Sequence, residues 1–353
     1  MNLDDPQSFR ALDPEDMLGY ITALPDQLEA AWQRAHSLPL PETFRHVRQI
    51  VLNGMGGSAI GGDLLAALIA DRCPIPILVN RDYVLPAFAA GPETLVIASS
   101  KSGGTEETLY AFDQALERGV QLLAIATGGA LIERARAAGV TCWDFTIACQ
   151  PRAALGWSFG LLIGLADRLG LAVGLDAEIE EAVELLRQGN DTYGADVPLA
   201  ENPAKRLAGQ FCGRVGVFYG GGILAPVARR WKAQFNENAK SWAEFDALPE
   251  MNHNGTVGTE FPAAVMDKWM VIFLRSAYDH PRVHLRHDLT RRLLMTQGIN
   301  TDTVTALGET RLAQMLSVTQ YGDYASYYLA MMNGVDPTPV PQIDLLKEGL
   351  ATR

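Results

Sequence analysis

The chain has few cysteines, and none of them are paired at the spacing of a metal site. Cys73, Cys142, Cys149 and Cys212 are scattered over 353 residues without a C-x-x-C pair. This distribution favours neither a zinc site nor a disulfide framework. Reduced thiols in a cytoplasm are the simplest interpretation.

Long apolar runs are also missing. The longest uncharged apolar stretch, Ala153 to Ala166, ends at Asp167 and Arg168 and is too short to span a bilayer. The first ten residues, MNLDDPQSFR, are acidic and polar, which is unlike a signal or transit peptide. We therefore expect a cytoplasmic protein without a membrane partner.

Positive charge is scarce as well. The chain has 29 Lys and Arg against 41 Asp and Glu, a formal net charge of -12, and no Lys/Arg run. Such a chain repels polyanions, which argues against a nucleic-acid partner. Any anionic ligand must therefore be held by a local site. With 48% hydrophobic residues, the chain is large enough for two buried cores.

Strand and helix patterns alternate along most of the chain. Short apolar runs rich in β-branched residues are separated by helical patterns, which is typical of parallel sheets covered by helices. The segment 214–239 repeats the strand, glycine turn and helix seen at 48–70. The predicted fold is α/β, with two doubly wound parallel sheets packed together and helical N-terminal and linking segments. We expect an N-terminal helical segment over 1–45, a first domain over 46–150, linking helices over 151–208, a second domain over 209–335, and a C-terminal turn and helix over 336–353.

One loop is unusually rich in hydroxyl groups. The apolar strand 95–98 is followed by Ser99, Ser100, Lys101, Ser102, Gly103, Gly104 and Thr105, and then by a helical pattern. At the carboxyl end of a parallel strand, such a loop offers backbone N–H groups, hydroxyls and a helix N-terminus to a phosphate. The alternative is that Ser102 or Thr105 only caps the helix. The density of hydroxyls favours a phosphate cradle formed by Ser100, Ser102 and Thr105.

A glycine-rich turn, NGMGGSAIGGD, follows the first predicted strand. Gly54, Gly56 and Ala59 match the dinucleotide fingerprint, and Asp82 could act as its ribose-binding acid. A dinucleotide has no evident use for the second anion-binding loop at 99–105. A sugar phosphate between both loops uses both, so we expect Gly56, Gly57 and Ser58 to contact substrate.

Histidines gather near residue 285. His280, His284 and His287 could hold a metal ion on a helix. Arg282 and Arg286 lie among them and would repel a cation, and Pro281 predicts that no regular helix forms there. We therefore expect no metal site.

Five motifs in this order, NGMGGSAIGGD, SSKSGGTEETL, QPRAALG, NENAKSW and NHN, resemble the bifunctional phosphoglucose/phosphomannose isomerase family. Its members are built from two sugar-isomerase (SIS) domains, and the resemblance extends from about residue 46 to the end of the chain. The family's serine loop usually reads S-Y-S-G-N-T. Here the hydroxyls are kept, but Lys101 and Gly104 replace the tyrosine and the asparagine.

The resemblance implies a metal-independent aldose-ketose isomerase that needs no cofactor. It would interconvert glucose 6-phosphate, and also mannose 6-phosphate, with fructose 6-phosphate through a cis-enediol. This chemistry requires a carboxylate base, a ring-opening group and positive charge near the enediolate.

The resemblance also assigns the residues. Glu237, between Asn236 and Asn238, would be the base, although on its own it reads as a solvated helix glutamate. His253, in a polar loop, would open the sugar ring. The remaining assignments are Arg152 beside the enediolate, Lys347 near the sugar ring and Thr338 near C2.

In relatives the histidine comes from a neighbouring subunit, so we expect a homodimer with shared sites. The alternative function is a non-catalytic, sugar-phosphate-binding regulator, which would need the serine loop but no base.

Overall fold

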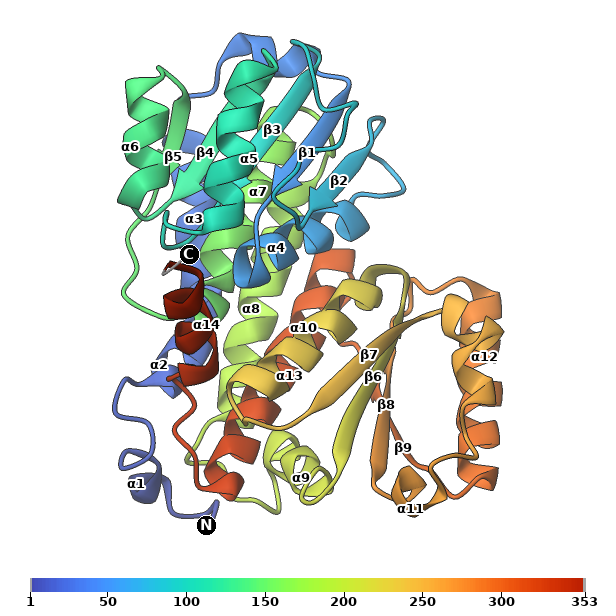
Figure 1. Ribbon diagram of the computed structural model, residues 1–353. Coiled ribbons are helices and arrows are strands. Elements are labelled where there is room, and N and C mark those ends of the chain that lie inside the picture. The colour runs from blue at the N-terminus through green and yellow to red at the C-terminus, as the bar shows by residue number, and fades with distance from the viewer. Residues whose placement is uncertain (1, 352–353) are drawn as a thin grey trace.

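The computed structural model describes residues 2–351 and contains two parallel β-sheets with helices packed on their faces (Figure 1). The first sheet has the strand order β2-β1-β3-β4-β5. Its strands are β1 (Gln49–Asn53), β2 (Ile77–Asn80), β3 (Thr94–Ser99), β4 (Gln121–Ala126) and β5 (Thr141–Asp144). The chain leaves β1 in one direction and returns to its other side at β3. The carboxyl ends of these two strands therefore form the switch point where open α/β sheets bind ligands.

The second sheet repeats this arrangement with the order β7-β6-β8-β9, again all parallel. Its strands are β6 (Val215–Gly221), β7 (Ala243–Leu248), β8 (Trp269–Arg275) and β9 (Asn300–Thr305). The predicted α/β class with two doubly wound sheets is confirmed. The division of the chain into five segments stays a prediction.

Helices cover both sheets and fill the space between them. The first half contains α1 (Pro6–Phe9), α2 (Met17–Thr22), α3 (Leu24–Ser37), α4 (Gly56–Leu68), α5 (Glu106–Glu117), α6 (Gly129–Ala137) and α7 (Leu155–Arg168), with short 3-10 turns η1 (Glu42–His46) and η2 (Pro151–Ala153). The second half contains α8 (Leu175–Tyr193), α9 (Pro203–Gln210), α10 (Ala225–Glu237), α11 (Ala263–Met266), α12 (Pro281–Thr296), α13 (Arg311–Asn333) and α14 (Pro341–Ala351), with 3-10 turns η3 (Gly222–Leu224), η4 (Glu250–His253) and η5 (Gly255–Val257).

Most of the apolar run at 153–166 lies in the interior helix α7. Its glycines recur every fourth residue and face α3, where a Cβ at Gly160 would come within 2.7 Å of Ala31 Cβ. Glycine at this position therefore allows the two helices to pack closely. Within residues 2–351, no helix is both long enough and apolar enough to traverse a bilayer.

Two local features differ from the sequence prediction. Pro281 does not prevent a helix, because it occupies the first turn of α12. Backbone N–H groups in the first turn have no partner within the helix, so the N–H that proline lacks is not needed there. Strand β7 was not predicted, because its residues AEFDAL are mostly half-buried at the sheet edge and lack an apolar run.

Candidate active site

The serine loop lies at the switch point of the first sheet. The Ser100 hydroxyl is buried, lies 2.8 Å from the Thr105 hydroxyl and accepts a 3.1 Å hydrogen bond from Gly103 N–H. Ser102 Oγ accepts a hydrogen bond from Gly104 N–H. Thr105 immediately precedes α5, yet its side chain accepts no hydrogen bond from the first turn of that helix. The Thr105 hydroxyl therefore does not cap α5; it contacts the Ser100 hydroxyl within the loop.

The glycine turn packs directly against this loop. Lys101 N–H donates to Ser58 Oγ at 3.1 Å, which joins the first turn of α4 to the loop. A Cβ at Gly54 would come 2.7 Å from Ser99 O, and one at Gly57 would come 2.7 Å from Pro151 O. The N-terminus of α4 is thus wedged between the serine loop and the segment that carries Arg152.

Arg152 is buried, and its guanidinium forms several hydrogen bonds. Its Nε donates to Asn238 Oδ1 at 2.7 Å, and its Nη1 lies 3.3 Å from Glu237 Oε2. Its Nη2 donates to the carbonyl oxygens of Pro337 (2.6 Å) and Thr338 (2.8 Å). Burial lowers the pKa of Arg152, and the neighbouring Glu237 carboxylate opposes that shift. The guanidinium thus connects Glu237 at the end of α10 to the C-terminal turn.

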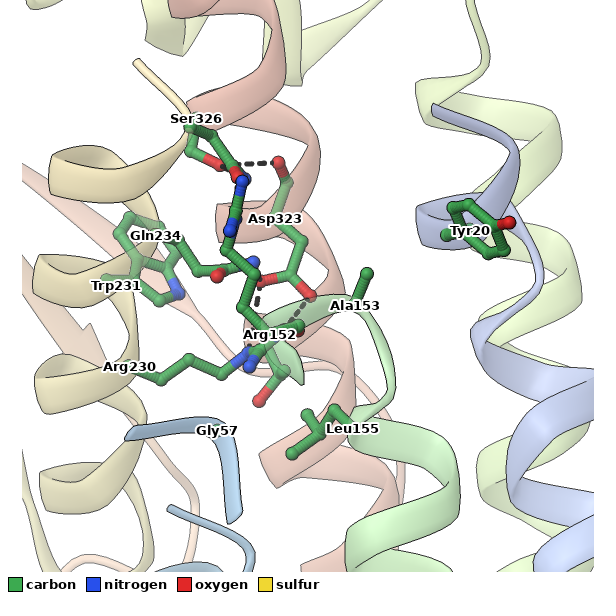
Figure 2. Close-up of polar contacts among 12 residues, drawn as sticks. Tyr20, Gly57, Arg152, Ala153, Leu155, Arg230, Trp231, Gln234, Asp323 and Ser326 are labelled. Carbon is green, nitrogen blue, oxygen red and sulfur yellow. Dashed lines mark hydrogen bonds and ion pairs between the residues drawn. The ribbon is translucent and has the colours of Figure 1, made fainter. Parts of the chain in front are cut away.

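A second buried ion pair, between Arg230 and Asp323, contacts the backbone of Arg152. Arg230 of α10 binds Asp323 of α13 through two hydrogen bonds of 3.1 and 2.6 Å, as Figure 2 shows. Arg230 Nη2 also donates to the Arg152 carbonyl at 3.0 Å. Gln234 Nε2 donates to Asp323 Oδ1 at 2.9 Å. Burial raises the pKa of Asp323, while Arg230 opposes that shift.

Glu237 and Arg152 line a cleft between α4 and α10. The cleft is lined by Gly56, Gly57, Ile60, Arg81, Arg152, Arg229, Arg230, Ala233, Gln234 and Glu237. A larger hollow of about 750 Å³ lies along the N-terminal segment, but its lining contains none of the predicted site residues. The smaller cleft, of about 110 Å³, brings a carboxylate, arginines and the glycine turn together, so its chemistry is the better match for a sugar phosphate.

Thr338 contacts Arg152 from the C-terminal turn. Its carbonyl oxygen accepts from Arg152, its side chain is buried, and its Oγ1 has no hydrogen-bond partner among residues 2–351. A buried hydroxyl without a partner is costly and is usually satisfied by a ligand or by water.

Of the predicted catalytic residues, Arg152 and Glu237 line the cleft, and His253 and Lys347 do not. His253 is exposed in η4, and Lys347 is exposed on α14. The loop of His253 is fixed from α12, since Asn252 Nδ2 donates to Thr290 Oγ1 at 2.7 Å and Arg286 Nη1 donates to Asn252 Oδ1 at 3.2 Å.

Lys240 is a further residue of the site that the sequence alone does not indicate. Its backbone is left-handed (φ 54°), and its amine donates to the carbonyl oxygens of Glu237 and Pro337. Burial and the nearby Arg152 lower the pKa of Lys240 to about 8, against the opposing effect of Asp336 and Glu237. The only signal available was its position in the NENAKSW motif beside Glu237.

No group of three or more His, Cys, Asp and Glu side chains that could hold a metal ion occurs in the part of the chain that the structure describes. Although α12 is a regular helix, its histidines do not form such a group.

Comparison with known proteins shows which proteins share this fold. A hypothetical protein of Thermus thermophilus superposes with a TM-score of 0.74 at 19% identity, covering 99% of this chain and 93% of that one, which shows the shared fold. Residues 200–350 match the family described as bacterial phospho-glucose isomerase C-terminal SIS domain. The fold and this match define a protein of the sugar-isomerase-domain class.

Full-length relatives identify the family. The bifunctional phosphoglucose/phosphomannose isomerase of Caldicellulosiruptor bescii is 42% identical over 331 residues, covering 93% of this chain and 97% of the relative. The protein of that name from Aquifex aeolicus is 35% identical over 302 residues, covering 85% and 90%. The chain belongs to the bifunctional phosphoglucose/phosphomannose isomerase family.

Proposed function

We propose that the chain interconverts glucose 6-phosphate and mannose 6-phosphate with fructose 6-phosphate. The observation that carries this proposal is the Glu237 carboxylate, which lies 3.3 Å from the buried Arg152 guanidinium. Both line a cleft that also includes Gly56 and Gly57 of the glycine turn, and this turn is joined to the serine loop by the Lys101–Ser58 hydrogen bond. A regulator that only binds sugar phosphates would need the loop but has no use for a carboxylate held in this way. Family membership supports the isomerase over that regulator.

The roles follow from the chemistry of an aldose-ketose isomerisation. Ser100, Ser102 and Thr105 hold the phosphate, with backbone N–H groups of the loop as further donors. Glu237 removes the proton from C2 and returns it to C1, which gives the ketose through a cis-enediol. The positive charge of Arg152 stabilises the enediolate as it develops.

Substrate breadth depends on the space near C2. Thr338 supplies a small side chain there and leaves room for both C2 epimers. In an assay coupled to product removal, kcat/KM for glucose 6-phosphate and mannose 6-phosphate should agree within about tenfold, or 1.4 kcal/mol. A preference above a hundredfold would make this a single-substrate enzyme. Turnover abolished by a chelator would contradict the metal-independent mechanism.

The site is completed, in this proposal, by a second subunit. His253 is exposed and outside the cleft, as expected for a residue that acts across a subunit boundary. Apolar side chains are exposed nearby on η5 and α12: Val257, Leu285, Leu289 and Leu293. A two-fold homodimer would cover these residues and form two equivalent sites in which His253 acts in trans as the ring-opening group.

Mixing two inactive variants tests the shared site. If His253 acts in trans, a heterodimer of Glu237→Gln and His253→Ala has one site with both lesions and one with neither. About a quarter of wild-type activity should then return at equal mixing. Absence of recovery despite demonstrated subunit exchange, or a fully active monomer in sedimentation, would contradict the shared site and leave the reaction itself untouched.

A cytoplasmic location is proposed as well. It is supported by four cysteines that are all unpaired in the structure.

A further inference from the structure

His253 has no side-chain partner that would hold its ring. Within residues 2–351 of one chain, the imidazole makes no hydrogen bond, ion pair or ring contact, and the residue is exposed in η4. A histidine that transfers protons is normally oriented by a group bonded to its second ring nitrogen. In this chain, the position of the imidazole is therefore set by the residues that hold its backbone.

Asn252, the residue before His253, is held at both ends of its side-chain amide. Its Nδ2 donates to Thr290 Oγ1 at 2.7 Å, and its Oδ1 accepts from Arg286 Nη1 at 3.2 Å. A guanidinium can only donate, so the amide has one orientation, with Oδ1 toward Arg286. The Asn252 carbonyl oxygen also accepts from Thr256 Oγ1 at 3.3 Å. Both the side chain and the backbone of Asn252 are thus fixed.

Asn254, the residue after His253, lacks contacts of this kind. It is exposed, its Nδ2 donates to Glu250 Oε1 at 3.3 Å, and its Oδ1 accepts from the adjacent Gly255 N–H. Both contacts remain within residues 250–255. The two asparagines that flank His253 therefore differ, because only Asn252 is bonded to α12.

Helix α12 is itself fixed to the second sheet. Thr290 is buried, and the buried His287 ring lies edge-on to the Phe273 ring of β8, with 5.7 Å between the ring centroids. Met251, just before Asn252, is fully buried in the same apolar cluster as Phe273. The turn that carries His253 is thus attached to the sheet directly through Met251 and indirectly through α12.

We infer that Asn252 and Thr290 are positioning residues for ring opening, because the Asn252 clamp, formed by Asn252, Arg286 and Thr290, places His253 at the ring oxygen of the sugar. The inference rests on the proposed function for the role of His253, and it adds the residues that make this role possible. All contacts of the clamp lie within one chain, so it serves His253 in either subunit.

Ring opening breaks the bond between C1 and the ring oxygen. The imidazolium of His253 gives a proton to the ring oxygen, and the C1 hydroxyl returns a proton to the imidazole, so no proton is gained or lost. The clamp transfers no proton itself. Its loss should therefore slow ring opening and leave binding of the sugar phosphate intact.

Ring opening can be measured without isomerisation. The α and β anomers of glucose 6-phosphate interconvert through the open chain, and this requires no transfer of the C2 proton. In Glu237→Gln, which lacks the proposed base, NMR exchange spectroscopy should show the anomers interconverting faster than they do without enzyme. The double variant Glu237→Gln/His253→Ala should lose that acceleration.

Variants of the clamp are compared in the Glu237→Gln background. Thr290→Val removes the acceptor at nearly constant volume and should lower the acceleration at least about tenfold, since a displacement of about 1 Å can cost about a hundredfold. Asn252→Ala should lower it at least as much. Thr290→Ser keeps the hydroxyl, and Asn254→Ala is the matched control on the other side of His253, so both should stay within about twofold.

Calorimetric titration with glucose 6-phosphate separates positioning from a general defect. Positioning predicts that the affinity of Thr290→Val and Asn252→Ala changes by less than about twofold while ring opening falls. A fold defect predicts that binding and ring opening fall together, and that Thr290→Ser does not restore the rate. That second pattern would overturn the inference.

Two other results would also overturn it. One is ring opening by Thr290→Val and Asn252→Ala at the rate of Glu237→Gln alone. The other is undiminished acceleration in Glu237→Gln/His253→Ala, because the clamp would then have nothing to position. If the wild type forms fructose 6-phosphate but the clamp variants do not slow ring opening, only this inference fails. If they slow it as stated but the wild type forms no fructose 6-phosphate, the clamp stands and the proposed isomerisation fails.

Discussion

Replacing Arg152 with lysine tests whether this residue organises the site. The guanidinium donates to Asn238 Oδ1 through Nε, faces Glu237 through Nη1, and reaches two carbonyl oxygens through Nη2. These acceptors lie on different sides of a planar fork, so a single ammonium group cannot reach all of them. Arg152→Lys therefore leaves buried acceptors without donors.

The size of the loss follows from burial. Arg152 is 3% exposed, and each buried acceptor that loses its donor costs about 1 to 3 kcal/mol, or about 2 to 6 kcal/mol for two acceptors. Each kcal/mol lowers the melting temperature of a domain by about 2 to 4 °C, so we expect Arg152→Lys to melt roughly 4 to 24 °C below the wild type. The turn at 336–340 should also become sensitive to limited proteolysis, because Arg152 holds its carbonyl groups.

Arg34→Lys is the matched control. The Arg34 guanidinium pairs with Asp144 at the surface at 3.1 Å, and both side chains are about two-fifths exposed. Its replacement should cost less than about 1 kcal/mol. Equal melting temperatures and equal proteolysis of the two variants would refute the role given to Arg152.

Three further predictions concern the loop, the glycine turn and Lys240. Ser100→Ala should raise KM for sugar phosphates and weaken inhibition by free phosphate, because a hydrogen bond to the dianion contributes about 1.5 to 3 kcal/mol; unchanged phosphate inhibition would contradict this. Gly57→Ala should reduce activity and stability, since its Cβ would lie 2.7 Å from Pro151 O, whereas Gly209→Ala, with nothing within 4 Å, should do neither. For Lys240, whose pKa is about 8, loss of the proton removes a positive charge from the site, so kcat/KM for the anionic substrate should fall as pH rises through about 8. Lys240→Met should lack that alkaline limb, and a limb of the same size in the variant would assign it to another group.

Local patterns were sufficient to predict much of the fold. The apolar runs that become β1, β3 and β6 are buried strands, and the glycine-rich turns after β1 and β6 are recognisable in the sequence. By contrast, β7 is an edge strand whose half-buried residues resemble a loop. Pro281 was misread because a proline is compatible with the first turn of a helix, and its position in that turn depends on where the helix begins.

The site could be predicted only where the signal is local. The hydroxyl groups of the serine loop lie within a few residues of one another, so their density is visible in the sequence. Arg152 and Glu237 are 85 residues apart, and their ion pair exists only once α10 packs beside η2. The pairing of Asp63 with Arg229 spans 166 residues and carries no sequence signal. Lys240 acquires its low pKa from burial and from Arg152, which are both products of the tertiary structure.

The most direct test of the proposed reaction is conversion of glucose 6-phosphate in D2O, followed by NMR spectroscopy. If Glu237 carries the C2 proton through a cis-enediol, its carboxyl proton can exchange with solvent before it is transferred, so part of the fructose 6-phosphate should carry deuterium at C1. Glu237→Gln should lower both conversion and exchange by several orders of magnitude while it still binds the sugar phosphate. Turnover, or deuterium incorporation, by Glu237→Gln at near the wild-type rate would contradict the account.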